Sequence, residues 1–140
     1  MNNFTQLYLG IFSLIISALS FLNILYCYYF KLYLNINNFT LVFIFSLFLG
    51  SVIFFKKKNL KKVSVFEKIL TVILGYICIP ILLSIPYFLI LNNINFLDAY
   101  FESISGFTST GFTIFNNIKH LDESLILWRS STQWLGGLYF

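Results

Sequence analysis

The chain has 140 residues, of which 59% are hydrophobic, 21% aromatic and only 10% charged, and its formal net charge is +4. A soluble globular domain of this length needs more charged surface than this composition supplies, so that class is excluded. The mean hydropathy of +0.85 indicates an all-α, polytopic protein of the cell (inner or plasma) membrane, surrounded by membrane lipid.

Two apolar segments near the N-terminus are typical of membrane spans. The first covers residues 7–30; it is too long for the apolar core of a signal peptide, and no basic segment or small-residue cleavage site accompanies it. Asn23 is the one polar amide within it, and we expect this amide to bond to a neighbouring helix. Residues 34–38 predict a short polar turn, and residues 39–55 predict a second, short span.

The lysines that follow set the expected orientation. Five of the nine basic residues lie between Lys56 and Lys62. A nucleic-acid-binding segment is one interpretation, but a cytoplasmic loop under the positive-inside rule is favoured, and no nucleic-acid partner is expected. Residues 1–62 are therefore predicted to form an N-terminal pair of transmembrane helices with a basic cytoplasmic loop. The N-terminus then lies in the cytoplasm, and residues 92–124 lie outside.

A second unit is predicted over residues 63–140. Its first span, residues 69–91, contains Pro80 and Pro86; each proline removes an intrahelical hydrogen bond, so we expect a kink there. A last apolar run begins near Leu125 and stops after sixteen residues at the end of the sequence. We expect this last helix to be cut short.

Between these two helices, residues 96–113 do not have the pattern of a span. Phe96–Phe107 predict an amphipathic helix of roughly 18 Å, too short for a hydrocarbon core of about 30 Å. Asn95 is its expected N-cap, and Asp98 in its first turn favours the positive helix end. A run of Gly, Thr and Ser residues follows, which suits extended backbone. A half-length helix followed by irregular backbone among membrane spans predicts a re-entrant pore loop, so residues 63–140 form one helix–pore loop–helix repeat.

Arg129 lies one turn into the last apolar run, where an unpaired charge is costly. Two placements stay open: its side chain snorkels to the outer interface, or it pairs with Asp98 or Glu102, which lie one turn apart on the half-length helix. We favour pairing, because Trp128 and Gln133 are expected to pack beside the arginine and hold it inward.

Two blocks of residues are similar to a known family. The first is Asp-Ala-x-Phe-Glu-x-x-Ser-Gly-Phe-Thr-x-Thr-Gly-x-Thr at residues 98–113, and the second is Trp-Arg-Ser-x-x-Gln-Trp-Leu-Gly-Gly at residues 128–137. In this order and at this distance, they resemble the potassium-translocating membrane subunit of the Trk/Ktr uptake systems. The resemblance implies a potassium-channel-like fold of four helix–pore loop–helix repeats around one ion path. This chain would supply the extra N-terminal helix pair of the Trk branch and the first repeat, as an N-terminal fragment of such a transporter.

The resemblance implies potassium uptake as the function, with residues 96–113 as one of four pore loops that form a selectivity filter. It assigns ion contact to Thr108, Ser109, Thr110 and Gly111, with potassium bound at Ser109 and Thr110. Backbone carbonyls can replace the hydration shell of potassium, and Gly111 can adopt a positive φ that brings its backbone close to an ion. Because a backbone carbonyl is the expected ligand, a Ser109→Thr substitution is expected to change little.

The resemblance also implies partners. They are a second copy of the protein, in a homodimer, and a cytosolic nucleotide-binding regulatory subunit. No cofactor is expected in this chain, because its sequence contains no nucleotide-binding motif, and potassium is the transported substrate.

An enzyme is not expected. Residues 103–106 are similar to the Gly-x-Ser-Gly of intramembrane proteases, but Ser103 replaces the first glycine, and the only histidine, His120, lies in a polar loop. Cys27 and Cys78 stand alone in apolar segments, without the spacing of a disulfide framework or a metal site. The alternative to transport is a truncated or degenerate membrane fragment that transports nothing.

Overall fold

The computed structural model describes residues 3–56 and 63–139, and these residues form helices and loops without a β-strand. Its helical elements are α1 (Asn3–Tyr29), α2 (Tyr33–Phe55), α3 (Val65–Ile90), α4 (Phe96–Phe107), the 3-10 helix η1 (Ile118–His120) and α5 (Glu123–Tyr139). Within the described ranges, α1, α2 and α3 are long and apolar enough to cross a membrane. The prediction of an all-helical, polytopic membrane protein is confirmed at this level.

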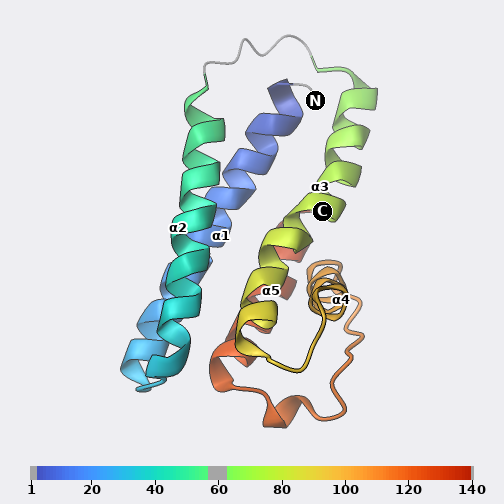
Figure 1. The fold of residues 1–140 in the computed structure, drawn as a ribbon. Coiled ribbons are helices and arrows are strands. Elements are labelled where there is room, and N and C mark those ends of the chain that lie inside the picture. The colour runs from blue at the N-terminus through green and yellow to red at the C-terminus, as the bar shows by residue number, and fades with distance from the viewer. Residues whose placement is uncertain (1–2, 57–62, 140) are drawn as a thin grey trace.

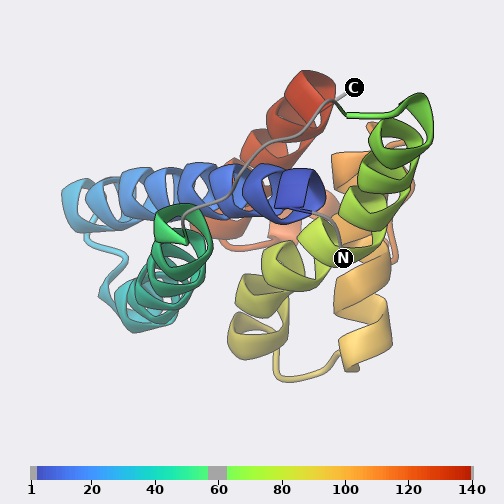
Figure 2. The ribbon, with the colours of Figure 1, turned by 90° about the horizontal axis from the view of Figure 1, so that it is seen from above.

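Helices α1 and α2 form an antiparallel hairpin and pack along much of their length (Figure 1, Figure 2). Two glycines allow the close contact: a Cβ at Gly10 would lie 2.8 Å from the Ile53 side chain, and one at Gly50 would lie 2.7 Å from the Leu14 side chain. A turn with Lys31 at a φ of 61° joins the two helices. Small residues at such contacts are typical of helices that pack within a membrane.

The predicted polar turn at residues 34–38 is wrong, because these residues lie in the first turns of α2. Asn35 is buried, and its side-chain amide donates a hydrogen bond to the Ser124 hydroxyl of α5 at 3.0 Å. Because the Ser124 hydroxyl satisfies the buried Asn35 amide, this residue can lie inside the fold. Helix α2 therefore begins before the apolar run at residue 39.

The prediction that Asn23 bonds to a neighbouring helix is also wrong. Its side-chain amide donates to the Leu19 carbonyl of its own helix at 3.4 Å. Short hydroxyl groups make the contact between helices instead: Thr5 of α1 and Thr71 of α3 share a hydrogen bond of 2.8 Å. The Asn23 amide reaches the preceding turn of its own helix, which is a common alternative for polar side chains in helices.

Helix α3 continues through both prolines and bends along its length, as the sequence predicts (Figure 1). The carbonyl three residues before each proline accepts a side-chain donor from another helix. The Tyr100 hydroxyl of α4 donates to the Ile77 carbonyl at 3.1 Å. The Trp128 indole N–H of α5 donates to the Leu83 carbonyl at 3.0 Å. Proline disturbs the helical hydrogen bonds of the preceding turn, so these two donors stabilise the bent helix and join it to α4 and α5.

A cluster of aromatic rings fixes the C-terminal end of α5. The rings of Tyr8, Phe12, Tyr76 and Phe107 contact the ring of Tyr139 at centroid distances of 5.5, 4.8, 5.1 and 5.1 Å. These residues come from α1, α3 and α4. Because Phe107 is the last residue of α4, the cluster also fixes the point at which the following loop begins.

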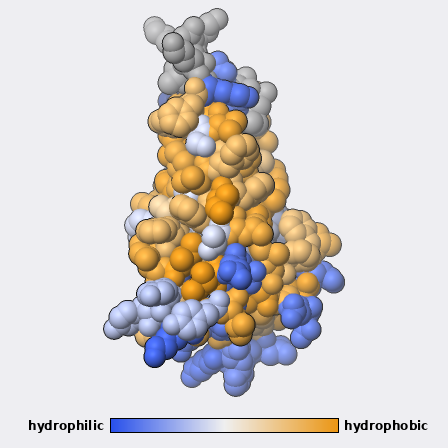
Figure 3. Space-filling view, turned by 60° about the vertical axis from the view of Figure 1, so that its left-hand side comes forward, coloured by the Kyte–Doolittle hydropathy of each residue, from blue (hydrophilic) through white to orange (hydrophobic). Residues whose placement is uncertain are grey.

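The outer surface is apolar over most of the height of the molecule on the face shown in Figure 3, and polar residues gather at its lower end. The exposed apolar side chains include Leu22, Phe48 and Ile73, one from each of the three long helices. In a bilayer these side chains contact lipid rather than water, so this surface fits a membrane-embedded protein.

Candidate functional site

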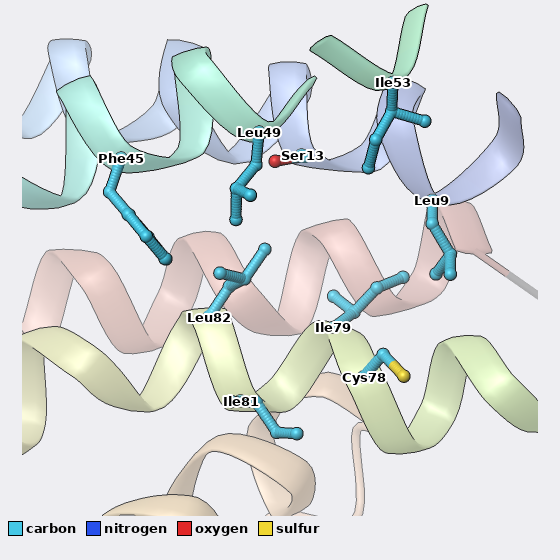
Figure 4. A pocket seen from close by; sticks show the side chains of 9 residues that line it. All are labelled: Leu9, Ser13, Phe45, Leu49, Ile53, Cys78, Ile79, Ile81 and Leu82. Carbon is cyan, nitrogen blue, oxygen red and sulfur yellow. The ribbon is translucent and has the colours of Figure 1, made fainter. Parts of the chain in front are cut away.

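A groove of about 330 Å³ lies between α1, α2 and α3 (Figure 4). Its lining is apolar apart from Ser13 and Cys78, and the Ser13 hydroxyl already donates to the Ser46 carbonyl at 2.8 Å. A specific binding site needs convergent polar groups beside its apolar walls. The groove lacks them, so the candidate site is sought on the other side of α3, in α4 and the loop that follows it (Figure 2).

Helix α4 spans Phe96–Phe107, the range predicted from the sequence. At its start, the backbone N–H of Asn95 donates to the Asp98 carboxylate at 3.3 Å, as half of a capping box. One face of α4, including Ala99 and Ser103, is buried, and the helix packs against α3 and α5. This packing places the C-terminal end of α4, and the loop after it, beside α5.

The loop leaves α4 through two residues in the left-handed region. Ser109 has a φ of 55° and Gly111 a φ of 81°. The amides of residues 108–110 donate to carbonyls in the last turn of α4 at 2.8, 2.9 and 3.0 Å. The sequence predicts that Gly111 can adopt a positive φ, but nothing in the sequence indicates one at Ser109, because serine rarely adopts this conformation.

The four residues predicted to bind potassium, Thr108, Ser109, Thr110 and Gly111, follow one another in this loop, and all are exposed. Their backbone carbonyls accept no hydrogen bond from the part of the chain that the structure describes. The hydroxyls of Thr108 and Thr110 bond to each other at 2.5 Å, and the Ser109 hydroxyl donates to the Gln133 carbonyl at 3.4 Å. The side chains are therefore occupied while the backbone oxygens are free. A row of free carbonyls can coordinate a cation that has lost its water.

A buried ion pair joins α4 to α5 next to this loop. The Glu102 carboxylate is fully buried and pairs with the Arg129 guanidinium, which is also buried. The same carboxylate accepts hydrogen bonds from the Thr113 hydroxyl at 3.1 Å and from the Ile114 N–H at 3.2 Å. The sequence left two placements open for Arg129. In the structure its side chain pairs with an acid, and the partner is Glu102 rather than Asp98.

Arg129 of the ion pair also donates a hydrogen bond to the backbone at Phe112, directly after the four residues predicted to bind potassium. The Phe112 carbonyl accepts the Ser105 hydroxyl at 2.6 Å and the Arg129 guanidinium at 3.4 Å. The run of free carbonyls at residues 108–111 therefore ends at a carbonyl that is held by two donors. Ser105 and Thr113 were part of the motif but had no assigned role in the sequence analysis, and their place in that motif is the signal that could have identified them.

Helix α5 passes very close to the end of α4. A Cβ at Gly136 would overlap the carbonyl oxygen of Phe107, so this contact requires glycine. A Cβ at the neighbouring Gly137 would have nothing within 4 Å. The two adjacent glycines of the second sequence block thus have different environments: Gly136 is a packing position against the start of the loop, and Gly137 is open.

The chain is similar to known cation transport proteins. Residues 35–140 match the family model TrkH, described as a cation transport protein. The chain is 40% identical over 86 residues to an uncharacterized cation transporter of Methanocaldococcus jannaschii, a match that covers 59% of this chain and 17% of the relative. It is 40% identical over 65 residues to the Trk system potassium uptake protein TrkI of Halomonas elongata, covering 46% of this chain and 13% of the relative.

A third relative matches a longer part of the chain. The Trk system potassium uptake protein TrkH of Escherichia coli K12 is 30% identical over 102 residues, which cover 71% of this chain and 21% of the relative. The chain thus matches only about a fifth, or less, of the length of these relatives. No solved structure matches the chain significantly.

Proposed function

We propose that this chain, which belongs to the TrkH family of cation transport proteins, takes part in potassium uptake across the cell membrane and supplies one of four pore loops of a selectivity filter. The observation that carries the proposal is the row of free, exposed backbone carbonyls at residues 108–111, at the end of the half-length helix α4. The names of the relatives from Halomonas elongata and Escherichia coli, both potassium uptake proteins, support the choice of ion.

In the proposed mechanism, potassium exchanges its hydration shell for backbone oxygens of the loop. The carbonyls of Ser109 and Thr110 are the direct ligands, with Thr108 and Gly111 on either side, and three further loops of the same kind complete the ring of oxygens. Helix α4 ends at Phe107, directly before these residues, so the negative end of its dipole favours a cation in front of it. The protein supplies oxygen ligands and orientation; it makes and breaks no covalent bond.

The proposal extends to the arrangement in the cell. The N-terminus is cytoplasmic, and the loop after α4 faces the outside, as the lysines between residues 56 and 62 indicate. The transporter works as a homodimer with a cytosolic nucleotide-binding regulatory subunit. The words "Trk system" in the names of the relatives support a transporter of more than one component.

A graft tests the proposed function. Residues 35–140 replace the matching segment of the Escherichia coli relative, and the chimera is produced in cells that lack their own potassium uptake. We expect growth at low external potassium and measurable potassium uptake. The alternative, a membrane fragment that transports nothing, predicts a chimera that reaches the membrane, as shown by immunoblot, but restores neither growth nor uptake.

A further inference from the structure

We infer that the Glu102–Arg129 ion pair is the positioning device of the loop: it anchors residues 112–114 and thereby sets cation preference without touching the ion. This inference rests on the proposed function, because cation preference has a meaning only if the loop lines an ion path. The sequence left open whether Arg129 pairs at all, and the family resemblance assigns no role to either charge.

The first step is that the pair is connected to the loop at three consecutive residues. Glu102 accepts the Thr113 hydroxyl at 3.1 Å and the Ile114 N–H at 3.2 Å. Arg129 donates to the Phe112 carbonyl at 3.4 Å. Both charged side chains are buried, the bonds to the loop are part-buried, and charge-assisted hydrogen bonds are stronger than neutral ones.

The second step is that the Gly111 carbonyl lies between two held segments and is not held itself. Gly111 has a φ of 81°, and the space where a Cβ would stand has nothing within 4 Å. Its amide donates to the Ser105 carbonyl at 3.5 Å, but its carbonyl accepts no hydrogen bond from the described residues, so the segments on either side position that carbonyl. The upstream flank is the turn at the end of α4, whose amides donate to carbonyls of that helix. The downstream flank is the segment that Glu102 and Arg129 hold.

The third step is geometric. Fixing the Phe112 carbonyl and the Ile114 amide holds two consecutive planar peptide units, so the Gly111 carbonyl in the unit before them can turn only about the backbone dihedrals of Phe112. The Ser105 hydroxyl holds the Phe112 carbonyl as well, at 2.6 Å. With that carbonyl occupied, the row of free carbonyls that begins at Thr108 ends at Gly111. Releasing the anchor frees the Phe112 carbonyl and lets the Gly111 carbonyl turn, and selectivity among cations depends on the number and orientation of such oxygens.

The test first uses the full 140-residue chain in lipid nanodiscs, and it does not depend on transport. Amide hydrogen exchange of Ile114 is measured by NMR in the unmodified chain and in Glu102→Gln, which keeps an acceptor of the same shape but removes the charge. We expect exchange to be roughly tenfold faster in the variant, a change of about 1.4 kcal/mol. The Lys119 amide, which donates to Asn117 at 3.1 Å in the same outer loop, serves as the internal control.

A matched variant separates the ion pair from a general loss of negative charge. Asp98 is a second carboxylate on α4, one turn earlier, and it bonds to Asn95 at the start of the helix rather than to the loop. Asp98→Asn is therefore expected to leave Ile114 exchange unchanged. Arg129→Lys keeps the positive charge but lacks the planar fork that reaches both Glu102 and Phe112, and it provides a second variant if Glu102→Gln does not fold.

The second measurement is the preference for potassium over sodium in the transporting chimera. We expect Glu102→Gln and Arg129→Lys each to lower this preference by roughly tenfold at an unchanged amount of protein in the membrane, and Asp98→Asn to leave it unchanged. A merely structural role predicts less protein with an unchanged preference, and that result overturns the inference. Unchanged Ile114 exchange in Glu102→Gln overturns it too. If the unmodified chimera reaches the membrane but transports nothing, the proposed function fails, and the exchange data alone decide whether the anchor exists.

Discussion

Gly111 has a backbone conformation that glycine adopts readily and that most other residues disfavour. It combines a φ of 81° with open space where a Cβ would stand, so a substitution meets no steric obstacle and acts through φ alone. We predict that Gly111→Ser lowers the potassium-over-sodium preference of the chimera by roughly tenfold, because an L-residue in the left-handed region costs about 1–2 kcal/mol. Potassium uptake with sodium as the competitor measures the change.

Asparagine provides the control for this prediction. Among residues with a side chain, asparagine tolerates the left-handed region comparatively well. Gly111→Asn is therefore expected to keep more of the potassium preference than Gly111→Ser, although its side chain is larger. An equal or larger loss in Gly111→Asn would mean that side-chain volume in the ion path, rather than the backbone conformation, decides the outcome.

Ser109 also adopts a positive φ, of 55°, and this changes what we expect of its substitutions. From the sequence, Ser109→Thr is expected to change little, because the backbone oxygen is the ligand. A β-branched residue is strongly disfavoured in the left-handed region, however. We now predict that Ser109→Thr destabilises the chain by about 1–2 kcal/mol, while Ser109→Gly does not. Thermal unfolding of the purified variants in detergent measures both, and equal stability of all three proteins would contradict the prediction.

The partner of Arg129 is a feature that the sequence does not determine. Asp98 and Glu102 lie one turn apart on α4, so helical periodicity places both on one flank and does not say which of them meets Arg129. The structure assigns Asp98 to the start of α4 and Glu102 to the ion pair. That choice depends on where α5 crosses α4, which is a property of the packed fold. The sequence does not determine the positive φ of Ser109 either, because the hydrogen bonds of the loop impose it on a residue with no preference for that conformation.

The sequence predicts where a helix begins when residues close to each other in the chain determine its start. The start of α4 agrees with the sequence because Asn95 and Asp98 form a capping contact three residues apart. Helix α2 begins earlier than expected because Asn35 is paired with Ser124, a residue 89 positions later in the chain. A contact over such a distance leaves no periodic pattern, so a polar segment that joins a helix through it is mistaken for a turn.

The contact between α4 and α5 gives a prediction at this scale. A Cβ at Gly136 would overlap the Phe107 carbonyl oxygen, whereas one at Gly137 would meet open space. We predict that Gly136→Ala destabilises the chain by about 1–3 kcal/mol, because overpacking forces the end of α4 away from α5. Gly137→Ala is expected to be neutral or to stabilise by up to about 1 kcal/mol, since alanine favours helix.

Thermal unfolding and exchange of the loop amides measure this difference. Gly136→Ala is expected to accelerate exchange at the Thr110 amide, which donates to the Ser105 carbonyl at 3.0 Å at the end of α4. Gly137→Ala is expected to leave that exchange unchanged. Equal effects of the two substitutions would indicate that α5 does not hold the end of α4 in this way.

In the whole molecule, the ends of the three long helices α1, α2 and α3 separate into two groups (Figure 1). The N-terminal end of α1, the C-terminal end of α2 and the N-terminal end of α3 lie at one end; the α1–α2 turn, the α3–α4 link and η1 lie at the other. If the loop after α4 faces the outside, as proposed, acids near it would attract external cations. The buried pairing of Glu102 with Arg129 removes one of them, so this attraction would fall to Asp98, Asp122 and Glu123.

The orientation of the molecule is the last prediction, and it rests on charge. Lys56 follows the C-terminal end of α2, and four further lysines come before residue 63; these four lie outside the described residues, so the predicted cytoplasmic loop is a matter of sequence. Basic loops stay in the cytoplasm. A reporter fused after Lys58 should therefore be active only in its cytoplasmic form, and one fused after Asn116 only in its external form. Replacing the five lysines by glutamine should weaken this asymmetry, while replacing Lys119, in the loop between α4 and α5, should not. The reverse pattern in the unmodified chain would place Asp122 and Glu123 in the cytoplasm and end their proposed role in attracting external potassium.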